Sequence, residues 1–388
     1  TAKTMSTASS GFNPIDVINK RAEISAMIIV LAGSLIIGLI TGLLSFNQWL
    51  ELTLAGISMG LILFLMSSGM TLVFGLMGIF NLAHGAFIAF GAYLGFQMVI
   101  ILDAATRKTD TIPQVIKLGK KTIPIMKDGK QVMKEIILEQ GWFYGDSWFN
   151  ALIVLILAIL FAAIVAGFFG FLFERVVVRP VYDNALKQIL VTMGGGIIIR
   201  ELLIAGWQAP GEFPKPAFLA GMNFFDFGIL SEEISIETFR IFGGAVGLAV
   251  FAILVITLNY TKIGLLIRAG VESKEMVEVH GYRIKLLFIL VFVAAIVLAA
   301  SGGVFWAQYA QAVDFDMGNT LLILVVVSII VGGMGSVYGC FIGSLLITLV
   351  MNYCNSMLSV IGGEMSAVLL MVAVLMWRPQ GLKPITAH

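Results

Sequence analysis

The chain has 388 residues, of which 59% are hydrophobic and only 12% are charged, and its formal net charge is +1. Ordinary soluble domains have about 25% charged residues, so this composition excludes a soluble globular protein, which could not cover its surface. The near-neutral net charge gives no reason to expect a nucleic-acid partner. The high hydrophobic content instead predicts that the protein lies in a lipid bilayer.

The N-terminal segment is polar, and residues 1–19 are rich in Ser and Thr. The first apolar run, at residues 24–46, is too long for the core of a signal peptide and lacks a small-residue cleavage pattern. We therefore predict a tail at 1–23 and an uncleaved membrane anchor after it.

Two long windows contain no formally charged residue, one between Glu51 and Asp103 and one from Met317 to Gly363. About 20 apolar residues cross a bilayer core of about 30 Å as a helix, so each window holds two crossings. Apolar runs without alternation favour helices over a closed barrel. The expected fold is an all-α, polytopic transmembrane bundle of about ten spans. We place the spans at 24–46, 52–77, 84–102, 148–173, 188–206, 240–260, 285–308, 318–334, 337–356 and 364–378.

An even number of crossings places both termini on one side. The tails and short connections on that side carry 13 of the 24 Lys and Arg residues, which predicts cytoplasmic termini by the positive-inside rule. Helices 1–3 then occupy residues 24–102, helices 4–10 occupy 148–378, and 379–388 is a second cytoplasmic tail.

The segment at 103–147 is the largest extramembrane piece and would lie on the opposite, periplasmic side. In it, Asp128-Gly129 separates two short extended runs, which is a common signal for a β-hairpin. The segment is either a solvated cap or a docking surface for a soluble partner.

Glycines recur at intervals of four within the apolar runs, as in Gly91 and Gly95 and in the series Gly335, Gly339 and Gly343. This spacing places small residues on one helix face, where they let transmembrane helices approach closely. We interpret these glycines as helix-packing positions.

Four polar residues at membrane depth are candidates for lining a translocation path. Asn81 and His84 are three residues apart between two apolar spans, and Arg200 and Glu201 lie within another. Polar groups at such depth are costly and often functional. The alternatives are a hydrogen-bonded junction for the first pair and interfacial charges for the second, and Arg200 and Glu201 need not pair.

Five motifs occur in order along residues 52–383. They are Gly78-Ile79-Phe80-Asn81-Leu82-Ala83-His84-Gly85 with Gly91-Ala92-Tyr93; Glu174-Arg175 with Arg179-Pro180 and Thr192-Met193-Gly194; Gly264 with Arg268-Ala269 and His280-Gly281; Gly332-Gly333-Met334-Gly335-Ser336 with Gly339 and Gly343; and Arg378-Pro379-Gln380-Gly381-Leu382. In this order the chain resembles the permeases of LIV-type ABC importers, which handle branched-chain amino acids, urea and related amides, and it is most similar to the H-type paralogue. The long 103–147 insertion departs from that pattern.

The resemblance implies a bacterial inner-membrane subunit that pairs with a homologous second permease, two ATP-binding cassette ATPases and a periplasmic substrate-binding protein. It also implies that the charged loop at 261–285 holds the helix that receives the ATPase's motion, with Arg179 and Pro180 as a second cytoplasmic contact. The coupling candidates are Arg268, Ala269, Glu272, Lys274, Glu275, Met276, Glu278 and Gly281. A charged loop that is merely solvated is the alternative interpretation.

The sequence contains no Walker A motif, no nucleophile elbow and no His, Cys and carboxylate spacing typical of a metal site. We therefore expect no enzyme activity and no cofactor in this chain, with ATP and Mg bound by partner subunits. The uncharged spans favour a neutral or zwitterionic solute: a branched-chain amino acid first, then urea or a short amide. A secondary transporter or solute channel without ATPase partners is the alternative, although the central windows lack the carboxylates that ion coupling requires.

Overall fold

The structure is a computed structural model that describes residues 14–41, 45–106, 122–127, 130–135, 148–182, 184–207, 210–212, 238–272 and 274–383. Among these residues, eight helices are long and apolar enough to cross a membrane, and two shorter apolar helices accompany them. These ten helices lie at the ten predicted positions, which confirms the polytopic helical bundle.

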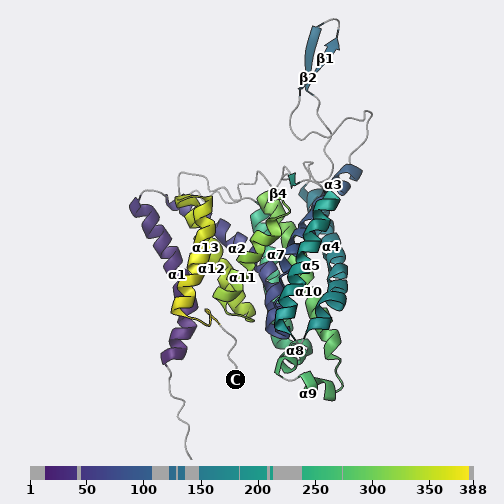
Figure 1. Cartoon of the computed structure of the whole chain (residues 1–388). Coiled ribbons are helices and arrows are strands. Elements are labelled where there is room, and N and C mark those ends of the chain that lie inside the picture. Colours follow the sequence, from purple (N-terminus) through teal and green to yellow (C-terminus); the bar gives the residue numbers. More distant parts are fainter. Residues whose placement is uncertain are drawn as a thin grey trace, which may run out of the picture.

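The apolar helices are α1 (Pro14–Thr41), α2 (Phe46–Met77), α3 (His84–Thr106), α4 (Trp148–Phe173), α5 (Ala185–Trp207), α7 (Thr238–Tyr260), α10 (Ile284–Ala310), α11 (Met317–Gly332), α12 (Val337–Met357) and α13 (Val360–Trp377). Two short helices, α8 (Lys262–Glu272) and α9 (Lys274–Val279), connect α7 to α10. We call the end of the bundle with α8 and α9 the lower side, and the end where α3 stops the upper side (Figure 1).

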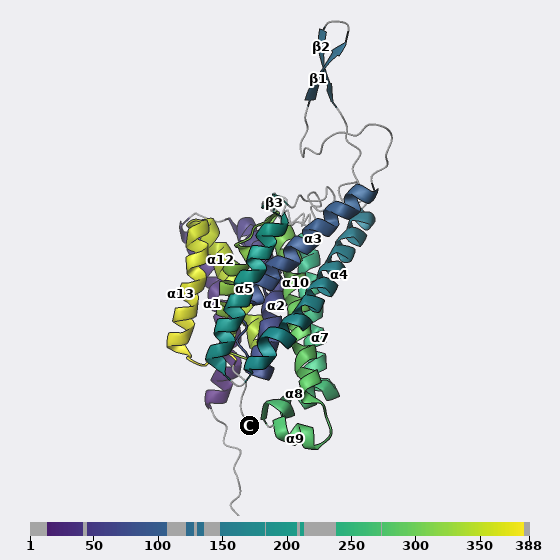
Figure 2. The same ribbon diagram turned by 45° about the vertical axis from the view of Figure 1, so that its right-hand side comes forward.

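Helix α2 forms the centre of the bundle and packs against α7, α10, α11 and α12. In Figure 1, α1 and α13 lie at one flank and α3, α4 and α5 at the other, and Figure 2 again shows α3 and α4 opposite α1 and α13. In its most apolar stretch, 78% of the α2 residues are buried, whereas only 17% are buried in α5. The core therefore surrounds α2, and α5 lies at the surface of the subunit.

Glycine allows the closest approaches between the core helices. A Cβ atom on Gly91 would overlap the backbone of Ala300 in α10, and one on Gly95 would overlap Val304. In the same way Gly339 and Gly343 in α12 lie directly against the backbone of α11. In lipid no hydrophobic driving force holds helices together. The close approach that small residues permit supplies van der Waals attraction between the helices instead.

Buried hydroxyl groups add direct hydrogen bonds between α2 and two of its neighbours, α11 and α12. Ser328 Oγ of α11 donates to Ser67 Oγ of α2 (2.7 Å), and Thr348 Oγ1 of α12 donates to the carbonyl oxygen of Gly56 (2.9 Å). Near the upper side, Thr53 and Tyr353 share a hydrogen bond of 2.6 Å. These bonds satisfy polar groups that hydrocarbon would leave unpaired.

Two details differ from the sequence prediction. The first helix begins at Pro14 and ends at Thr41 instead of covering 24–46, because Ser45 and Gln48 form a capping box that already starts α2 at Phe46. Gly335 lies in the turn before α12, with φ of +82°, and so does not share the helical face of Gly339 and Gly343.

Strands β1 (Thr122–Lys127) and β2 (Lys130–Glu135) pair antiparallel within the predicted insertion, from Thr122 opposite Glu135 to Lys127 opposite Lys130. Most of the insertion (107–121, 128–129 and 136–147) lies outside the described residues, as do 1–13 and 384–388 of the predicted tails. A second, smaller ladder on the upper side joins β3 (Gly211–Glu212) to β4 (Ala312–Val313).

Candidate functional site

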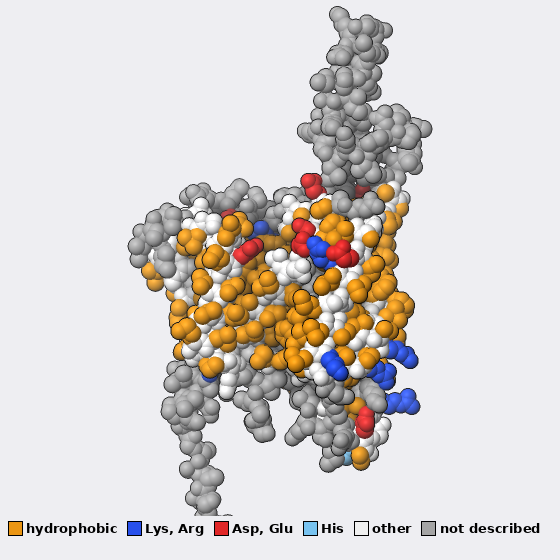
Figure 3. All heavy atoms as spheres, in the orientation of Figure 1, with side chains coloured by type: hydrophobic (Ala, Val, Ile, Leu, Met, Phe, Trp, Pro, Cys, Tyr) orange, Lys and Arg blue, Asp and Glu red, His pale blue; other side chains and the backbone are white. Residues whose placement is uncertain are grey.

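A charged cluster interrupts the otherwise apolar face formed by α5 and its neighbours. Figure 3 shows that hydrophobic side chains cover most of this face and that charged ones are few between its upper and lower borders. The cluster consists of Arg200 and Glu201 of α5 and of Asp314 and Asp316, which precede α11. We call it the Arg200 cluster.

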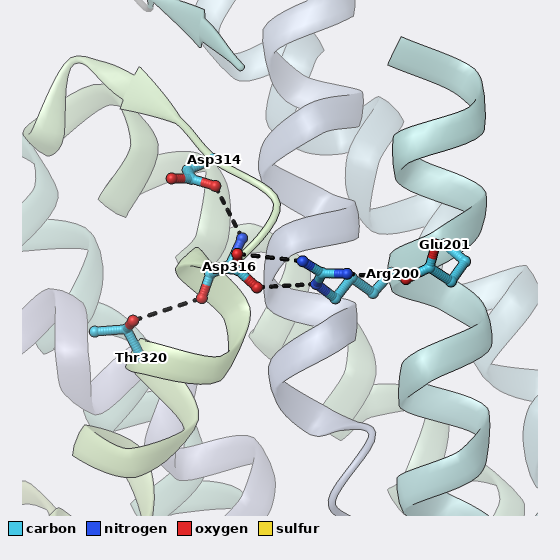
Figure 4. A network of polar contacts seen from close by, with 5 residues as sticks. All are labelled: Arg200, Glu201, Asp314, Asp316 and Thr320. Carbon is cyan, nitrogen blue, oxygen red and sulfur yellow. Dashed lines mark hydrogen bonds and ion pairs between the residues drawn. The ribbon is translucent and has the colours of Figure 1, made fainter. Parts of the chain in front are cut away.

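The Arg200 guanidinium holds the cluster together (Figure 4). Its Nε donates to Asp316 Oδ1 (2.9 Å) and its Nη2 to Asp316 Oδ2 (3.2 Å), so the pair is bidentate. Its Nη1 donates to Glu201 Oε1 at 2.9 Å. The backbone N–H of Asp316 donates to Asp314 Oδ1 (2.9 Å), which fixes the loop that carries the carboxylate. Helix geometry left the pairing of Arg200 and Glu201 open, and the structure shows that they pair.

The position of Arg200 along α5 bears on whether this face of the subunit contacts lipid, water or protein. Arg200 precedes the upper end of α5, at Trp207, by about 10 Å along the helix axis, and 32% of its side chain is exposed. A charged group exposed to lipid at such depth is costly and normally faces a bundle interior or a water-filled cavity. Within the cluster, the hydrogen bonds from Arg200 hold the pKa of Asp316 below its ordinary value.

Directly beside the cluster runs a groove between α3, α5 and α11 with a volume of about 300 Å³. Its walls are largely apolar and include Ala86, Met193, Ile197 and Leu322. Arg200 and Asn319 are the charged and amide groups that reach it. We call this space the α5 groove. It can take a small solute that has both an apolar and a charged part.

A second cleft shows what distinguishes the α5 groove. It lies between α3, α4 and α5, has a volume of about 440 Å³, and is lined by side chains such as Phe87, Phe169, Phe173 and Leu202. None of the residues that line it is charged. Of these two spaces, only the α5 groove has a charged side chain in its wall.

Asn81 and His84 lie inside the subunit and not on the α5 face, since each is only 1% exposed. The ring Nε2 of His84 forms a 2.9 Å hydrogen bond with the carbonyl oxygen of Met66 in α2. Asn81 precedes α3, and its Oδ1 accepts a bond from the N–H of Ala83 (3.1 Å). In this arrangement both residues fasten the turn between α2 and α3. Leu82, in the same turn, lines the lower end of the α5 groove.

On the lower side, α8 and α9 fold back onto the bundle. Ile267 and Val277 are buried against it, and Gly281 ends the segment with φ of +83°, a conformation that glycine adopts freely. Ala269, Glu278, Val279 and Tyr282 are exposed. The side chains of Arg268, Glu272, Lys274, Glu275 and Met276 lie outside the described part of the chain.

The connection from α4 to α5 forms a second lower-side surface, through a π-helix (Glu174–Val178) and a short 3-10 turn (Arg179–Val181). The hydroxyl of Tyr182 donates to the buried carboxylate of Glu174, and burial together with this bond raises the pKa of Tyr182. Arg179 and Pro180 remain exposed beside this anchored turn. The turn therefore offers a fixed surface to a partner.

Comparison with protein families identifies the chain. The model of the branched-chain amino acid transport system/permease component family matches residues 52–377. The chain belongs to this permease family. Its members are membrane components of transport systems, so the permease is a transport subunit and not an enzyme.

Curated relatives agree with the family assignment. The permease is 22% identical to the high-affinity branched-chain amino acid transport system permease protein LivH of Escherichia coli over 344 residues, which cover 87% of this chain and 96% of LivH. It is 23% identical to BraD of Pseudomonas aeruginosa over 337 residues, covering 86% and 95% of the two chains. The E. coli permease protein LivM matches 58% of this chain at 24% identity. No solved structure matches the permease.

Sequence reasoning about the permease missed the partners of Arg200. Asp316 lies 116 positions further along the chain, and no local spacing relates the two residues. One signal was available, because Asp314 and Asp316 stand immediately before the uncharged window that starts at Met317. Charges at the border of a transmembrane segment are candidates to meet a charge within another span.

Proposed function

We propose that this permease forms half of the translocation path of an ATP-driven importer for branched-chain amino acids, and that the path runs along the α5 groove. The observation that supports this most directly is the Arg200 cluster. It places charge at membrane depth on a helix that the subunit leaves largely uncovered. Such a face requires water or a second protein against it.

The second protein in this proposal is a homologous permease. The exposed residues of α5 include Leu190, Met193, Ile197 and Leu202, a surface suited to another membrane helix. The match to LivM supports a paralogous partner, since one chain resembles both permease types. Two related subunits facing each other across their α5 grooves would enclose a central pathway.

Two ATPases would bind on the lower side, which in this proposal faces the cytoplasm, and would supply the site for ATP and Mg. The exposed Val279 and Tyr282 beside Glu278 offer an apolar contact with a charged rim. Because Ile267 and Val277 tie the same segment to the bundle, force applied to it would reach α7 and α10 directly. The turn at Arg179 and Pro180 would form the second contact.

A substrate-binding protein would deliver the solute from the upper, periplasmic side of a bacterial inner membrane. The insertion at 103–147, with its β1–β2 hairpin, is available there as a docking surface. The names of LivH and BraD both specify branched-chain amino acids, which supports this substrate class ahead of urea or short amides. Nothing in those names supports a secondary transporter or a channel.

The test is to purify the permease with its partners and measure ATP hydrolysis and leucine uptake in proteoliposomes. Replacing Glu272 with Arg or Met276 with Asp should leave ATP hydrolysis intact and abolish the uptake that depends on it, because the coupling contact is lost. The control is Glu364→Arg, which changes an exposed carboxylate near the upper end of α13. Normal uptake by the two coupling variants would contradict the coupling assignment. Uptake by the permease alone, without ATPases, would contradict the importer.

A further inference from the structure

We propose that the Arg200 cluster and the α5 groove together form a binding subsite for a zwitterionic amino acid, which enters by exchanging ion-pair partners with Arg200 and Asp316. This inference rests on the proposed function and makes it more specific. It predicts that the permease itself recognises the charged head group, in addition to any selection by a soluble partner.

The charges in the cluster match those of an amino acid. One guanidinium stands between two carboxylates, from Asp316 and Glu201. A free amino acid carries one carboxylate and one ammonium on neighbouring atoms. The incoming carboxylate would take the place of Asp316 on the Nε and Nη2 face of Arg200, a planar fork that binds carboxylates in bidentate geometry. The released Asp316 carboxylate would accept the ammonium, so the net charge of the site stays the same.

In the proposed water-filled groove the exchange costs little, because the existing pair lies open at the surface of the subunit. The exposed fraction of the side chain is 32% for Arg200 and 63% for Asp316. Ion pairs exposed to water contribute little to stability, so a competing carboxylate can replace one partner. Glu201 keeps its bond to Nη1 during the exchange and holds the guanidinium in place.

The apolar part of the solute has a matching surface. The α5 groove begins at Arg200 and continues along Ile197 and Met193 of α5 and Leu322 of α11. A branched aliphatic side chain could lie there while its head group binds the cluster, and Asn319 supplies an amide at the same wall. Urea and simple amides have no carboxylate to exchange, so this subsite selects amino acids over them.

The competing explanation is that Arg200 and Asp316 form only a structural latch between α5 and the segment before α11. The two explanations differ for a charge reversal. Exchanging the two side chains, in Arg200→Asp with Asp316→Arg, restores an ion pair and hence a latch. It places the guanidinium on the other wall of the groove, so a bound amino acid would need the opposite orientation.

The first experiment measures leucine uptake by the complete complex, with its ATPases and binding protein, in proteoliposomes. Arg200→Gln and Asp316→Asn should each reduce uptake by about tenfold or more, and the charge-reversed double variant should not recover it. Glu364→Gln is the control and should transport normally. Recovery of uptake in the double variant, or normal uptake in both single variants, would overturn the inference.

The second experiment detects occupancy without a binding protein. Met193 lines the α5 groove and is exposed. The Met193→Cys variant, made in a Cys354→Ser background, is treated with a maleimide, and the rate of alkylation is measured. Leucine should slow the alkylation, whereas leucinamide and isovalerate, which each lack one of the two charges, should not. Arg200→Gln should remove the protection. Leucine uptake without any protection would overturn this inference alone, and the absence of leucine uptake by the unmodified complex would contradict the proposed function.

Discussion

Helices α2 and α5 are both apolar and long enough to span a bilayer, yet 78% of one window and only 17% of the other are buried. The difference lies in where the small residues stand. In α2, Gly56, Gly60 and Gly69 each meet a neighbouring helix, whereas Gly194 of α5 has open space beside it. Apolarity thus determines that a helix enters the membrane, and the spacing of small residues determines which helices surround it.

The polar side chains of α2 and α5 also differ in where their partners lie. The buried polar side chains of α2 are hydroxyls, such as Ser67 and Thr53, whose partners lie inside the subunit. The polar groups of α5 include Arg200, which faces outward with part of its surface open. Substitutions at buried positions of α2 should therefore affect folding, and substitutions of α5 residues that line the groove should affect transport.

The largest effect is expected when a core glycine is enlarged. Gly69→Leu would drive a side chain into the backbone of Ala295, where no rotamer change can make room, and should destabilise the fold by about 3 kcal/mol. The matched change Gly194→Leu in α5 should alter stability by less than about 0.5 kcal/mol. Thermal unfolding of the purified permease in detergent measures both. Equal losses would show that α5 is packed as tightly as α2.

A smaller effect, confined to transport, should follow from filling the α5 groove. Gly196 lines the groove, so Gly196→Phe should obstruct it and reduce leucine uptake by about tenfold, equivalent to about 1.4 kcal/mol. Ile198→Phe, at an exposed position of the same helix outside the groove, should transport normally. Unfolding temperatures of both variants separate obstruction from a folding defect, since a Cβ on Gly196 would lie 3.3 Å from Ala83 Cα. A Gly196→Phe variant with full uptake would remove the groove from the path.

A still smaller change should follow from removing one hydroxyl in the core. Thr53→Val keeps the shape of the side chain and breaks its hydrogen bond with Tyr353, at an expected cost of about 0.6 kcal/mol, as is typical between membrane helices. Tyr353→Phe should cost a similar amount, and the double variant no more than either single one. Additive losses in a double-mutant cycle would show that the two hydroxyls act independently.

The smallest effect concerns protonation of the Arg200 cluster. Because the hydrogen bond from Arg200 lowers the pKa of Asp316 from its ordinary value, the carboxylate and its ion pair are lost only as the pH falls through this lowered pKa. Infrared difference spectra between the permease and an Asp316→Asn variant would follow this carboxyl group. Arg200→Gln should return its midpoint to the ordinary range, and an unchanged midpoint would contradict the pairing.

Much of the fold could be predicted from the sequence because lipid imposes simple rules. Two uncharged windows predicted four of the ten apolar helices and shorter apolar runs predicted the others, while four-residue glycine spacing identified Gly91, Gly95, Gly339 and Gly343 as positions of close contact. The boundary between α1 and α2 was less accurate, since a capping box within an apolar stretch overrides hydropathy. Local patterns predict local structure and packing faces, but they do not predict which distant segments meet.

The candidate site shows that limit clearly. Arg200 was recognisable as unusual from its position in a span, but its bond to Asp316 depends on how α5 lies beside the start of α11. The burial of His84 likewise depends on its contact with α2 rather than on any feature of its neighbours in sequence. These relations arise from tertiary packing, for which a single sequence contains no direct signal.

The short β3–β4 ladder has a mechanical consequence for the α5 groove. It joins the segment after α5 to the segment before α11, through the pairs Gly211–Val313 and Glu212–Ala312. The two walls of the groove are therefore tied together at their upper ends and cannot separate there without breaking backbone hydrogen bonds. In the proposed transport cycle the ladder would act as a pivot, so that the groove would widen most at its opposite end, near the segment proposed to contact an ATPase.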